Sequence, residues 1–185
     1  MSLNPYITTV LQTTVSVDPH LLCCDVRDNI KDILITSLKH KCIAEGYIKD
    51  IYDINILSDG CIDMYSKKCN VTYLVEYECM LCKLSKNDIV VGRVDIITQT
   101  FIKLSNDAIS IMVSADRINE INFYNQNNTI IYKHNNKPIE VGDYIIVNVE
   151  TVYTVEQDTE IKVLGKLLNI AIDKDIDEYY TNFNK

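Results

Sequence analysis

The side chains best suited to chemistry in this chain are its seven cysteines. Two of them are close together in the segment Cys79-Met-Leu-Cys82. A zinc site needs a second such pair at a suitable distance, and the other five cysteines do not supply one. A redox pair usually begins a helix, whereas Cys79 and Cys82 end a β-rich run. The pattern therefore predicts free thiols that are buried as small apolar side chains, with no bound metal.

Catalytic patterns are not found elsewhere in the sequence. The three histidines are far apart and belong to no metal or nucleophile motif, and there is no Gly-rich phosphate loop. Asp173, Asp175 and Asp177 alternate near the C-terminus, but the rest of a calcium loop is missing, so they are read as a solvated charge run. We expect no catalytic site and no cofactor.

One set of residues could contact single-stranded RNA. Exposed aromatic rings stack on bases, and nearby cations contact phosphates. The candidate RNA-binding residues are Arg93, Phe101, Lys103, Arg117 and Lys133. The alternative is that the aromatic side chains are ordinary residues of β-strands.

The charge of the chain argues against a strong phosphate binder. Its 185 residues include 18 basic and 26 acidic ones, a net charge of −8. Divided after Ser85, the two parts carry −3 (8 minus 11) and −5 (10 minus 15). No apolar run is long enough to cross a bilayer, and the start has no secretory signal pattern. The sequence thus predicts a soluble protein that is not exported and makes no membrane contact.

The first 82 residues are expected to form a small α+β unit. Residues 4–17 alternate as a strand does, and a helix follows that begins at Asp18-Pro19 or at Asp25 and continues to Leu38. Residues 41–56 return to β character, interrupted at Glu45-Gly46. A turn at 58–60, a short strand at 61–65 and a polar loop at 66–70 follow. A long strand at 71–81 completes the unit, with the odd-numbered residues from Val71 to Cys79 on one face.

The remaining residues predict a five-stranded OB-type β-barrel. Short runs rich in Val and Ile occur at 89–97, 101–104, 109–113, 144–155 and 161–172. Gly92 and Gly165 indicate the bends that a small closed barrel needs. A small β-meander is the alternative for the first three runs. Residues 119–137 are read as an insertion loop, and 173–185 as a frayed charged tail. The predicted fold class is α+β, with domains at 1–82 and 83–172, and the strand 71–82 leading into the barrel without a flexible linker.

This order of parts resembles the seventh-subunit family of eukaryotic and archaeal DNA-directed RNA polymerase, which forms the polymerase stalk. The resemblance covers roughly Val10 to Ile172. It rests on Asp18-Pro19, Gly46-Tyr47-Ile48, Gly60, Val71 to Tyr77, Asp88 to Val94, Phe101, Val113-Ser114, Gly142-Asp143 and Leu164-Gly165. The proline and Gly-Glu pair usual before the first barrel strand are missing, and Thr100 replaces a glycine. An abundance of Ile, Asn, Lys and Tyr points to a version encoded by a large DNA virus.

The resemblance implies a non-catalytic subunit that acts in transcription. Its N-terminal tip domain would dock on the largest polymerase subunit and an adjacent small subunit, and its barrel would lie near the RNA exit. A second stalk subunit and nascent RNA are further partners that the resemblance allows. It would be found in the virion and the infected-cell cytoplasm if viral, and otherwise in the nucleus. The alternatives are a free-standing OB-fold RNA-binding or translation factor and an enzyme of unknown type.

The resemblance also places the docking site at the tip of the first domain, predicted as the segment 42–53 with the turn 58–60. The docking residues would be Ile43, Gly46, Tyr47, Ile48, Ile51, Tyr52 and Gly60. These are more apolar residues than one face of a short strand region can bury, so some should be exposed in the free chain. Gly46 would let the backbone approach the partner closely. The alternative is that these side chains pack under the helix.

Overall fold

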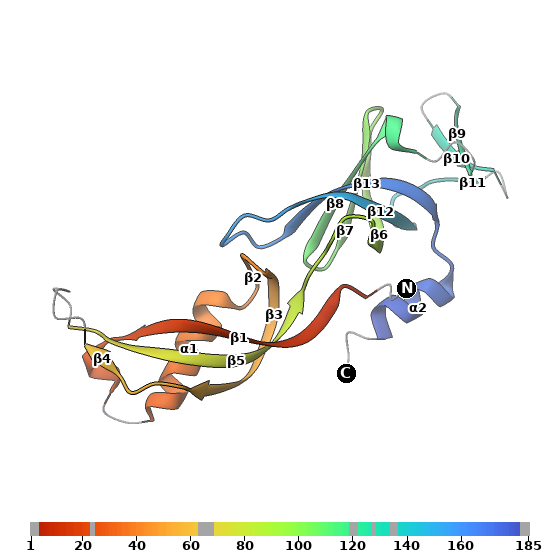
Figure 1. The fold of residues 1–185 in the computed structure, drawn as a ribbon. Coiled ribbons are helices and arrows are strands. Elements are labelled where there is room, and N and C mark those ends of the chain that lie inside the picture. The colour runs from red at the N-terminus through yellow and green to blue at the C-terminus, as the bar shows by residue number, and fades with distance from the viewer. Residues whose placement is uncertain are drawn as a thin grey trace.

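The protein is mostly β, with one sheet backed by a helix and one closed five-stranded barrel. The computed structural model describes residues 4–22, 25–62, 69–118, 122–126, 129–133 and 137–181. Figure 1 shows the sheet and the barrel as two bodies joined by the strand β5 (Val71–Cys82). Parts of the predicted strand 61–65, the loop 66–70, the insertion 119–137 and the tail lie outside the described residues.

The N-terminal sheet has the strand order β1-β5-β3-β2, and β4 also pairs with β5. The strands are β1 (Tyr6–Val17), β2 (Lys41–Ile43), β3 (Gly46–Ile56) and β4 (Cys61–Ile62). The odd-numbered residues of β5 from Val71 to Leu81 face the helix and are buried, except Tyr73, which is half-buried. On the other face of the strand, Leu74 and Glu78 are exposed. The alternation predicted for this strand is therefore confirmed.

The helix α1 (Val26–Leu38) covers one face of this sheet with its buried residues Ile30 and Leu34. It begins after Asp25, the second of the two predicted starts. Asp18-Pro19 instead begins only the short 3₁₀ turn η1 (Pro19–Leu21). The physical reason is that the apolar stripe which packs on the sheet begins at Val26, so only the later start places a full helical face on the core.

Polar side chains of α1 protect the part of β3 that β2 does not reach. β2 pairs only with Gly46 to Ile48, which leaves the outer edge of β3 beyond these residues without a strand partner. Arg27 donates to the carbonyl oxygen of Ile54 at 2.8 Å, and Lys31 donates to that of Tyr52 at 2.7 Å. These bonds satisfy edge carbonyls that would otherwise invite another strand.

The barrel has the closed strand order β12-β13-β8-β7-β6, consistent with the predicted OB-type barrel. Its strands are β6 (Ile89–Ile97), β7 (Phe101–Asn106), β8 (Ile109–Ser114), β12 (Tyr144–Tyr153) and β13 (Ile161–Ile170). All neighbours are antiparallel except β8 and β13, which run parallel. A register shift opposite Gly165 accompanies a close approach of its backbone to β12, because an added Cβ would overlap Val147 and lie 2.9 Å from the carbonyl oxygen of Asn148. The predicted bend at this glycine is confirmed.

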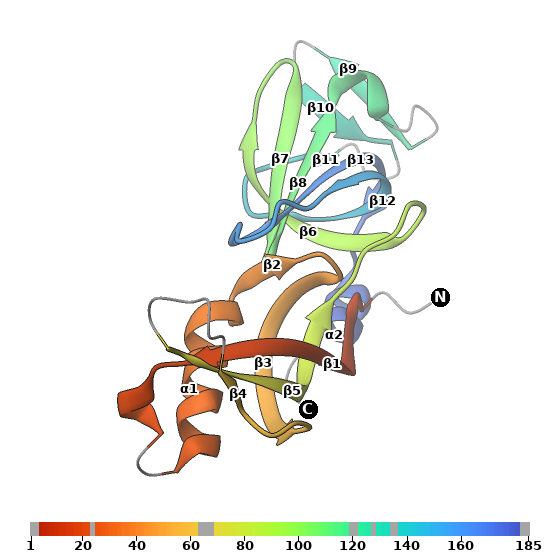
Figure 2. The ribbon, with the colours of Figure 1, turned by 60° about the vertical axis from the view of Figure 1, so that its left-hand side comes forward.

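The two bodies share a tight junction. β5 ends at Cys82, which belongs to the barrel core, and β6 begins at Ile89. The amide of Cys42 donates to the carbonyl oxygen of Asp158 at 2.8 Å, and the amide of Gln157 donates back to that of Cys42 at 2.9 Å. The strand β2 therefore lies against the barrel, while β4 lies at the far end of the sheet (Figures 1 and 2).

Two predictions of irregular structure are wrong. Within 119–137 the described residues form a small sheet of β9 (Phe123–Gln126), β10 (Thr129–Tyr132) and β11 (Lys137–Pro138). Phe123 is only 1% exposed and packs on Tyr132 with ring centroids 5.3 Å apart. Burial of this ring in the barrel core explains why the segment is ordered.

The C-terminal segment forms the helix α2 (Asp173–Thr181), not a frayed tail. At the N-terminus of the helix, the carboxylate of Asp175 accepts a hydrogen bond from the amide of Ile172 at 3.1 Å. Its end is held by Tyr179, which is completely buried. In both views α2 lies beside the start of β1, so it packs where the two bodies meet.

Gly46 and Gly142 provide a matched test of the junction. Both have positive φ, +153° and +100°, but an added Cβ at Gly46 would overlap the carbonyl oxygen of Cys82, whereas the nearest atom at Gly142 is 3.9 Å away. We expect Gly142→Ala to cost about 1 kcal/mol of unfolding free energy and Gly46→Ala about 3 kcal/mol. Equilibrium unfolding in urea measures both, and equal losses would show that the contact with Cys82 is unimportant.

Candidate functional site

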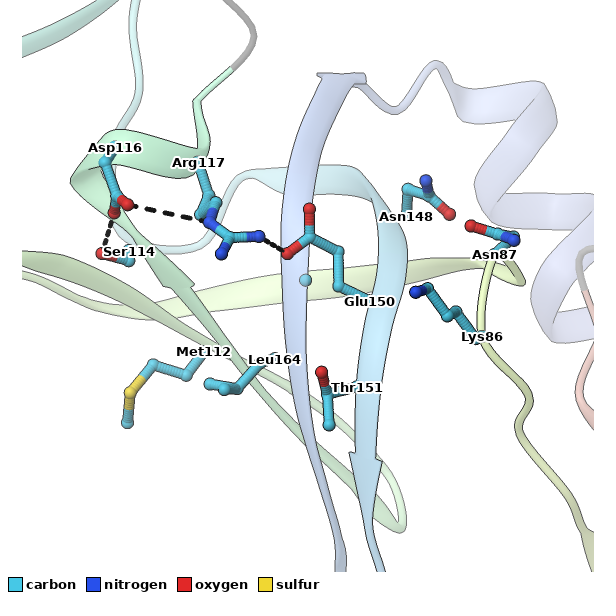
Figure 3. A pocket seen from close by; sticks show the side chains of 11 residues that line it. Lys86, Asn87, Met112, Ser114, Asp116, Arg117, Asn148, Glu150, Thr151 and Leu164 are labelled. Atoms are coloured by element: carbon cyan, nitrogen blue, oxygen red, sulfur yellow. Dashed lines mark hydrogen bonds and ion pairs between the residues drawn. The ribbon is translucent and has the colours of Figure 1, made fainter.

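A broad hollow lies on the outside of the barrel. This cavity of about 510 Å³ is lined by the turn at Lys86 and Asn87, by β8, β12 and β13, and by the 3₁₀ turn η2 (Ala115–Arg117). Figure 3 shows Met112 and Leu164 side by side on one side of it and Arg117 with Glu150 across the middle. The cavity therefore combines an aliphatic wall with a polar one, which is an arrangement for binding.

The charges around Arg117 are already matched within the protein. Its guanidinium donates to the carboxylate of Glu150, and its Nε lies 3.7 Å from Asp116. A hydrogen bond from the Ser114 hydroxyl lowers the pKa of Asp116, and the guanidinium of Arg117 lowers it further. Because two carboxylates hold its charge, Arg117 is a poor phosphate ligand.

The predicted RNA-binding residues are only partly brought together. Phe101 on β7 is paired with Ser114 of β8 and lies beside η2. Lys133 lines a second cavity of about 400 Å³ together with Ala115 and Asp116. Phe101, Arg117 and Lys133 thus lie around η2. Lys103 follows on β7, where it is paired with Met112 of β8. Arg93 lies on β6 between Tyr144 of β12 and Ser105 of β7, two residues from Lys103.

The predicted docking residues are mostly interior. The sequence predicts that some apolar residues of 42–53 are exposed; Tyr52 is exposed, whereas Tyr47, Ile48 and Ile51 are 6%, 0% and 5% exposed. Ile48 and Ile51 pack in the core under α1, as the alternative reading held, but Tyr47 packs against the barrel instead. Sequence periodicity could not reveal this, because it does not show that a second body covers the other face.

Among the other docking residues, Tyr52 is 41% exposed, Gly60 is exposed and Ile43 is half-buried. Within the chain, the backbone at Gly46 closely approaches the carbonyl oxygen of Cys82. At Gly60 an added Cβ would lie 2.9 Å from the Tyr73 ring, so this residue has to be small for β4 to pair with β5.

Two groups of exposed apolar side chains were missed by the sequence reasoning. Leu57, Ile62 and Leu74 lie at the end of the N-terminal sheet away from the barrel, and Ile96, Met112 and Leu164 lie on the barrel. The first group could have been found, since Leu57 and Ile62 flank the predicted turn at Gly60. The second could not, because its members come from three different strands.

Cys79 and Cys82 are both buried. Burial raises the pKa of Cys79 to about 11 and that of Cys82 to about 12, so both remain protonated at neutral pH. They also belong to different cores, Cys79 under α1 and Cys82 in the barrel. In the ranges that the structure describes, no group of three or more His, Cys, Asp or Glu side chains is placed to hold a metal ion. Nor does any described helix have the length and apolar character to span a membrane.

Comparison with known proteins finds one relevant relative. The chain is 26% identical over 174 residues to a protein of Acanthamoeba polyphaga mimivirus that is named, provisionally, as a DNA-directed RNA polymerase subunit. The match covers 94% of this chain and 87% of that protein. No protein-family model matches the sequence. The similarity supports a role as an RNA polymerase subunit.

Thiol reactivity should follow the two burial classes. Cys61 and Cys69 are exposed, whereas Cys42, Cys79 and Cys82 are buried. We expect iodoacetamide at pH 8 to label Cys61 and Cys69 first and Cys79 at least about 100-fold more slowly, because the thiolate is the reactive form. Peptide mass spectrometry measures each rate, with urea-unfolded protein as the control in which the rates converge. Fast labelling of Cys79 in the native protein would contradict the burial.

Proposed function

We propose that this chain is the stalk subunit of a multisubunit DNA-directed RNA polymerase, without catalytic activity of its own. The observation that carries the proposal is architectural. A helix-backed sheet passes through one strand, β5, directly into a closed barrel, which is the order of parts that the sequence resemblance predicts. Similarity to a mimivirus protein named as a polymerase subunit supports the same role along nearly the whole chain.

The docking surface is the end of the N-terminal sheet that lies away from the barrel. Leu57 and Leu74 are neighbours there, joined by a 2.9 Å hydrogen bond from the amide of Leu57 to the carbonyl oxygen of Leu74. They are 43% and 38% exposed, and Ile62, at the same end, is 61% exposed. Leu74 lies eight residues along β5 from Cys82, roughly 27 Å at strand spacing. Docking at this end leaves the barrel free.

The predicted docking residues Tyr52 and Gly60 remain part of this surface, because both are exposed. Ile43, Gly46, Tyr47, Ile48 and Ile51 would act indirectly, since they pack β2 and β3 against α1 and the barrel. The partners are the largest polymerase subunit and a small subunit beside it, with room for a second stalk subunit. A viral version would act in the virion and the infected-cell cytoplasm, and a cellular one in the nucleus.

Charge inserted at the docking end should release the subunit from the polymerase. We expect Leu57→Glu with Leu74→Glu to lower polymerase recovery in a pull-down at least tenfold, because apolar anchors at an interface are each worth on the order of 2 kcal/mol. The matched control is Val141→Glu with Val155→Glu, two side chains that are 65% and 57% exposed outside this end. Full recovery with the first variant, folded by circular dichroism, would place docking elsewhere. Substitutions at Gly46 or Tyr47 are unsuitable because they would disturb the interior.

The barrel would lie near the emerging transcript and contact it weakly around η2. Phe101 offers a half-buried ring there, and Lys133 is an exposed cation on the neighbouring cavity. Arg117 is held by carboxylates, and the chain is acidic overall, so binding should be weak and sensitive to salt. Arg93 and Lys103 would add only long-range attraction.

Removal of the ring and the cation tests this contact. Phe101→Leu with Lys133→Gln keeps the apolar packing of residue 101 but removes stacking and charge. We expect a roughly tenfold loss of affinity for labelled single-stranded RNA at low salt, since one stacked base is worth about 1–3 kcal/mol. The control pair is Tyr153→Leu with Lys166→Gln, on other strands of the barrel. Equal losses in both pairs would mean that the RNA passes elsewhere on the barrel.

The second candidate is a free-standing OB-fold RNA-binding or translation factor. The closed barrel favours it, but the acidic charge of both parts of the chain does not. Co-purification distinguishes the two, because a stalk subunit travels with a large polymerase and a free factor does not.

A further inference from the structure

An aliphatic row crosses the outer surface of the barrel. Ile96 on β6, Met112 on β8 and Leu164 on β13 are 49%, 43% and 40% exposed. Lys103 on β7 lies between Ile96 and Met112 in the paired registers, and Met112 is directly paired with Leu164. The three apolar side chains, here called the aliphatic row, therefore stand on one line across four neighbouring strands.

This alignment differs from scattered surface hydrophobics. Neighbouring strands are about 4.8 Å apart, so three steps from β6 to β13 give a row roughly 14 Å long. Met112 and Leu164 also form the aliphatic wall of the cavity on the barrel, and Lys86 lies on its opposite side (Figure 3). Contiguous exposed apolar groups next to a hollow are typical of a binding surface and not of a solvated face.

Several cations near the row have no ion-pair partner among the described residues. They are Lys103 in the row, Lys86 at the cavity and Arg93 on β6. Among the other cations nearby, Arg117 is neutralised by Glu150 and Lys162 by Asp158 at 2.8 Å. Asp95, beside Ile96, is the one described carboxylate next to the row without a pair. With Arg117 shared by Glu150 and Asp116, the charges named around the row are five cations and four carboxylates, a small positive excess in a chain of net charge −8. The unpaired cations therefore favour an acidic partner.

The closed barrel decides the form of such a partner. The closed barrel leaves little free strand edge under the row, because pairing with β12 covers β6 from Ile89 to Arg93 and a short stretch of β6 beyond Val94 has a strand partner on one side. An extended segment would leave its own backbone groups without partners, whereas a helix satisfies them internally. Apolar side chains at helix positions i, i+4, i+7 and i+11 span about 16 Å, close to the length of the row.

Stacked RNA fits this face less well. The exposed residues of the row are aliphatic, and base stacking requires aromatic planes. Flexible Met112 instead suits an apolar helix face, to which it can adapt.

We propose that the aliphatic row binds one acidic amphipathic helix from another polypeptide. The helix lies across β6, β7, β8 and β13, sets its apolar residues on Ile96, Met112 and Leu164, and directs its carboxylates to Lys103, Lys86 and Arg93. This binding does not depend on attachment to a polymerase.

The probe is a fluorescent 16-residue helical peptide with Leu at i, i+4, i+7 and i+11 and Glu on the opposite face. Its controls are a peptide of the same composition with the Leu residues dispersed, and a single-stranded RNA 16-mer. Fluorescence anisotropy with the full chain measures each affinity. We expect the amphipathic peptide to bind at least tenfold more tightly than the dispersed one.

Two variants test whether the peptide binds on the aliphatic row. Met112→Ser with Leu164→Ser should weaken the peptide at least tenfold, and Lys103→Glu should weaken it and reduce its salt dependence. Val141→Ser with Val155→Ser, the same change at exposed residues outside the row, should leave affinity unchanged. Thermal unfolding of the four proteins should agree closely, since Met112, Leu164, Val141 and Val155 are exposed and Lys103 is only half-buried.

The outcomes separate the possibilities. No preference for the amphipathic peptide, or equal weakening by the two serine pairs, would overturn the proposal. Tighter RNA binding that is lost in Met112→Ser with Leu164→Ser would make the row an RNA surface and would also overturn it. Failure here leaves the docking test at Leu57 and Leu74 untouched, because that test uses the other end of the molecule.

Discussion

The junction between the sheet and the barrel is the constraint on which the placement of every surface depends. Two backbone hydrogen bonds join Cys42 to the turn at Gln157 and Asp158, and Cys82 carries β5 into the barrel core. Tyr6 and Tyr47 fill the space between the two bodies. Lys49 adds an ion pair to Asp107 at 3.0 Å, and the Tyr6 hydroxyl donates to the same carboxylate at 3.2 Å. The ion pair is partly exposed and contributes about 1 kcal/mol or less, so packing and backbone bonds dominate.

Burial at this junction also governs its chemistry. Desolvation raises the pKa of Tyr6 and of Tyr47, and that of Cys82 to about 12, because the charged form of each group would lose its water. These side chains are therefore neutral packing groups under physiological conditions. Cys79 and Cys82, whose spacing could serve a metal or a redox step, instead lie in two different hydrophobic cores.

The junction keeps the two candidate binding surfaces at different ends of the molecule. The apolar residues Leu57, Ile62 and Leu74 are exposed at one end, and the aliphatic row lies on the barrel at the other. Because β5 runs the length of the sheet and ends at Cys82 in the barrel core, a partner bound at the first end would set the position of the barrel. The acidic charge of the chain limits phosphate binding, and the unmatched cations beside Ile96, Met112 and Leu164 favour an acidic polypeptide.

The local elements could be predicted from the sequence because strand and helix periodicities are properties of neighbouring residues. The alternation of β5, the stripe of α1, the five barrel strands and the bend at Gly165 all follow from residue type and spacing. Only the tertiary structure decided which apolar faces are covered, since this depends on elements that are distant in sequence. The barrel buries Tyr47, and the rings of Phe123 and Tyr179 are buried within segments that periodicity alone left irregular. The registers of β6, β7, β8 and β13 likewise align Ile96, Met112 and Leu164, which no local pattern connects.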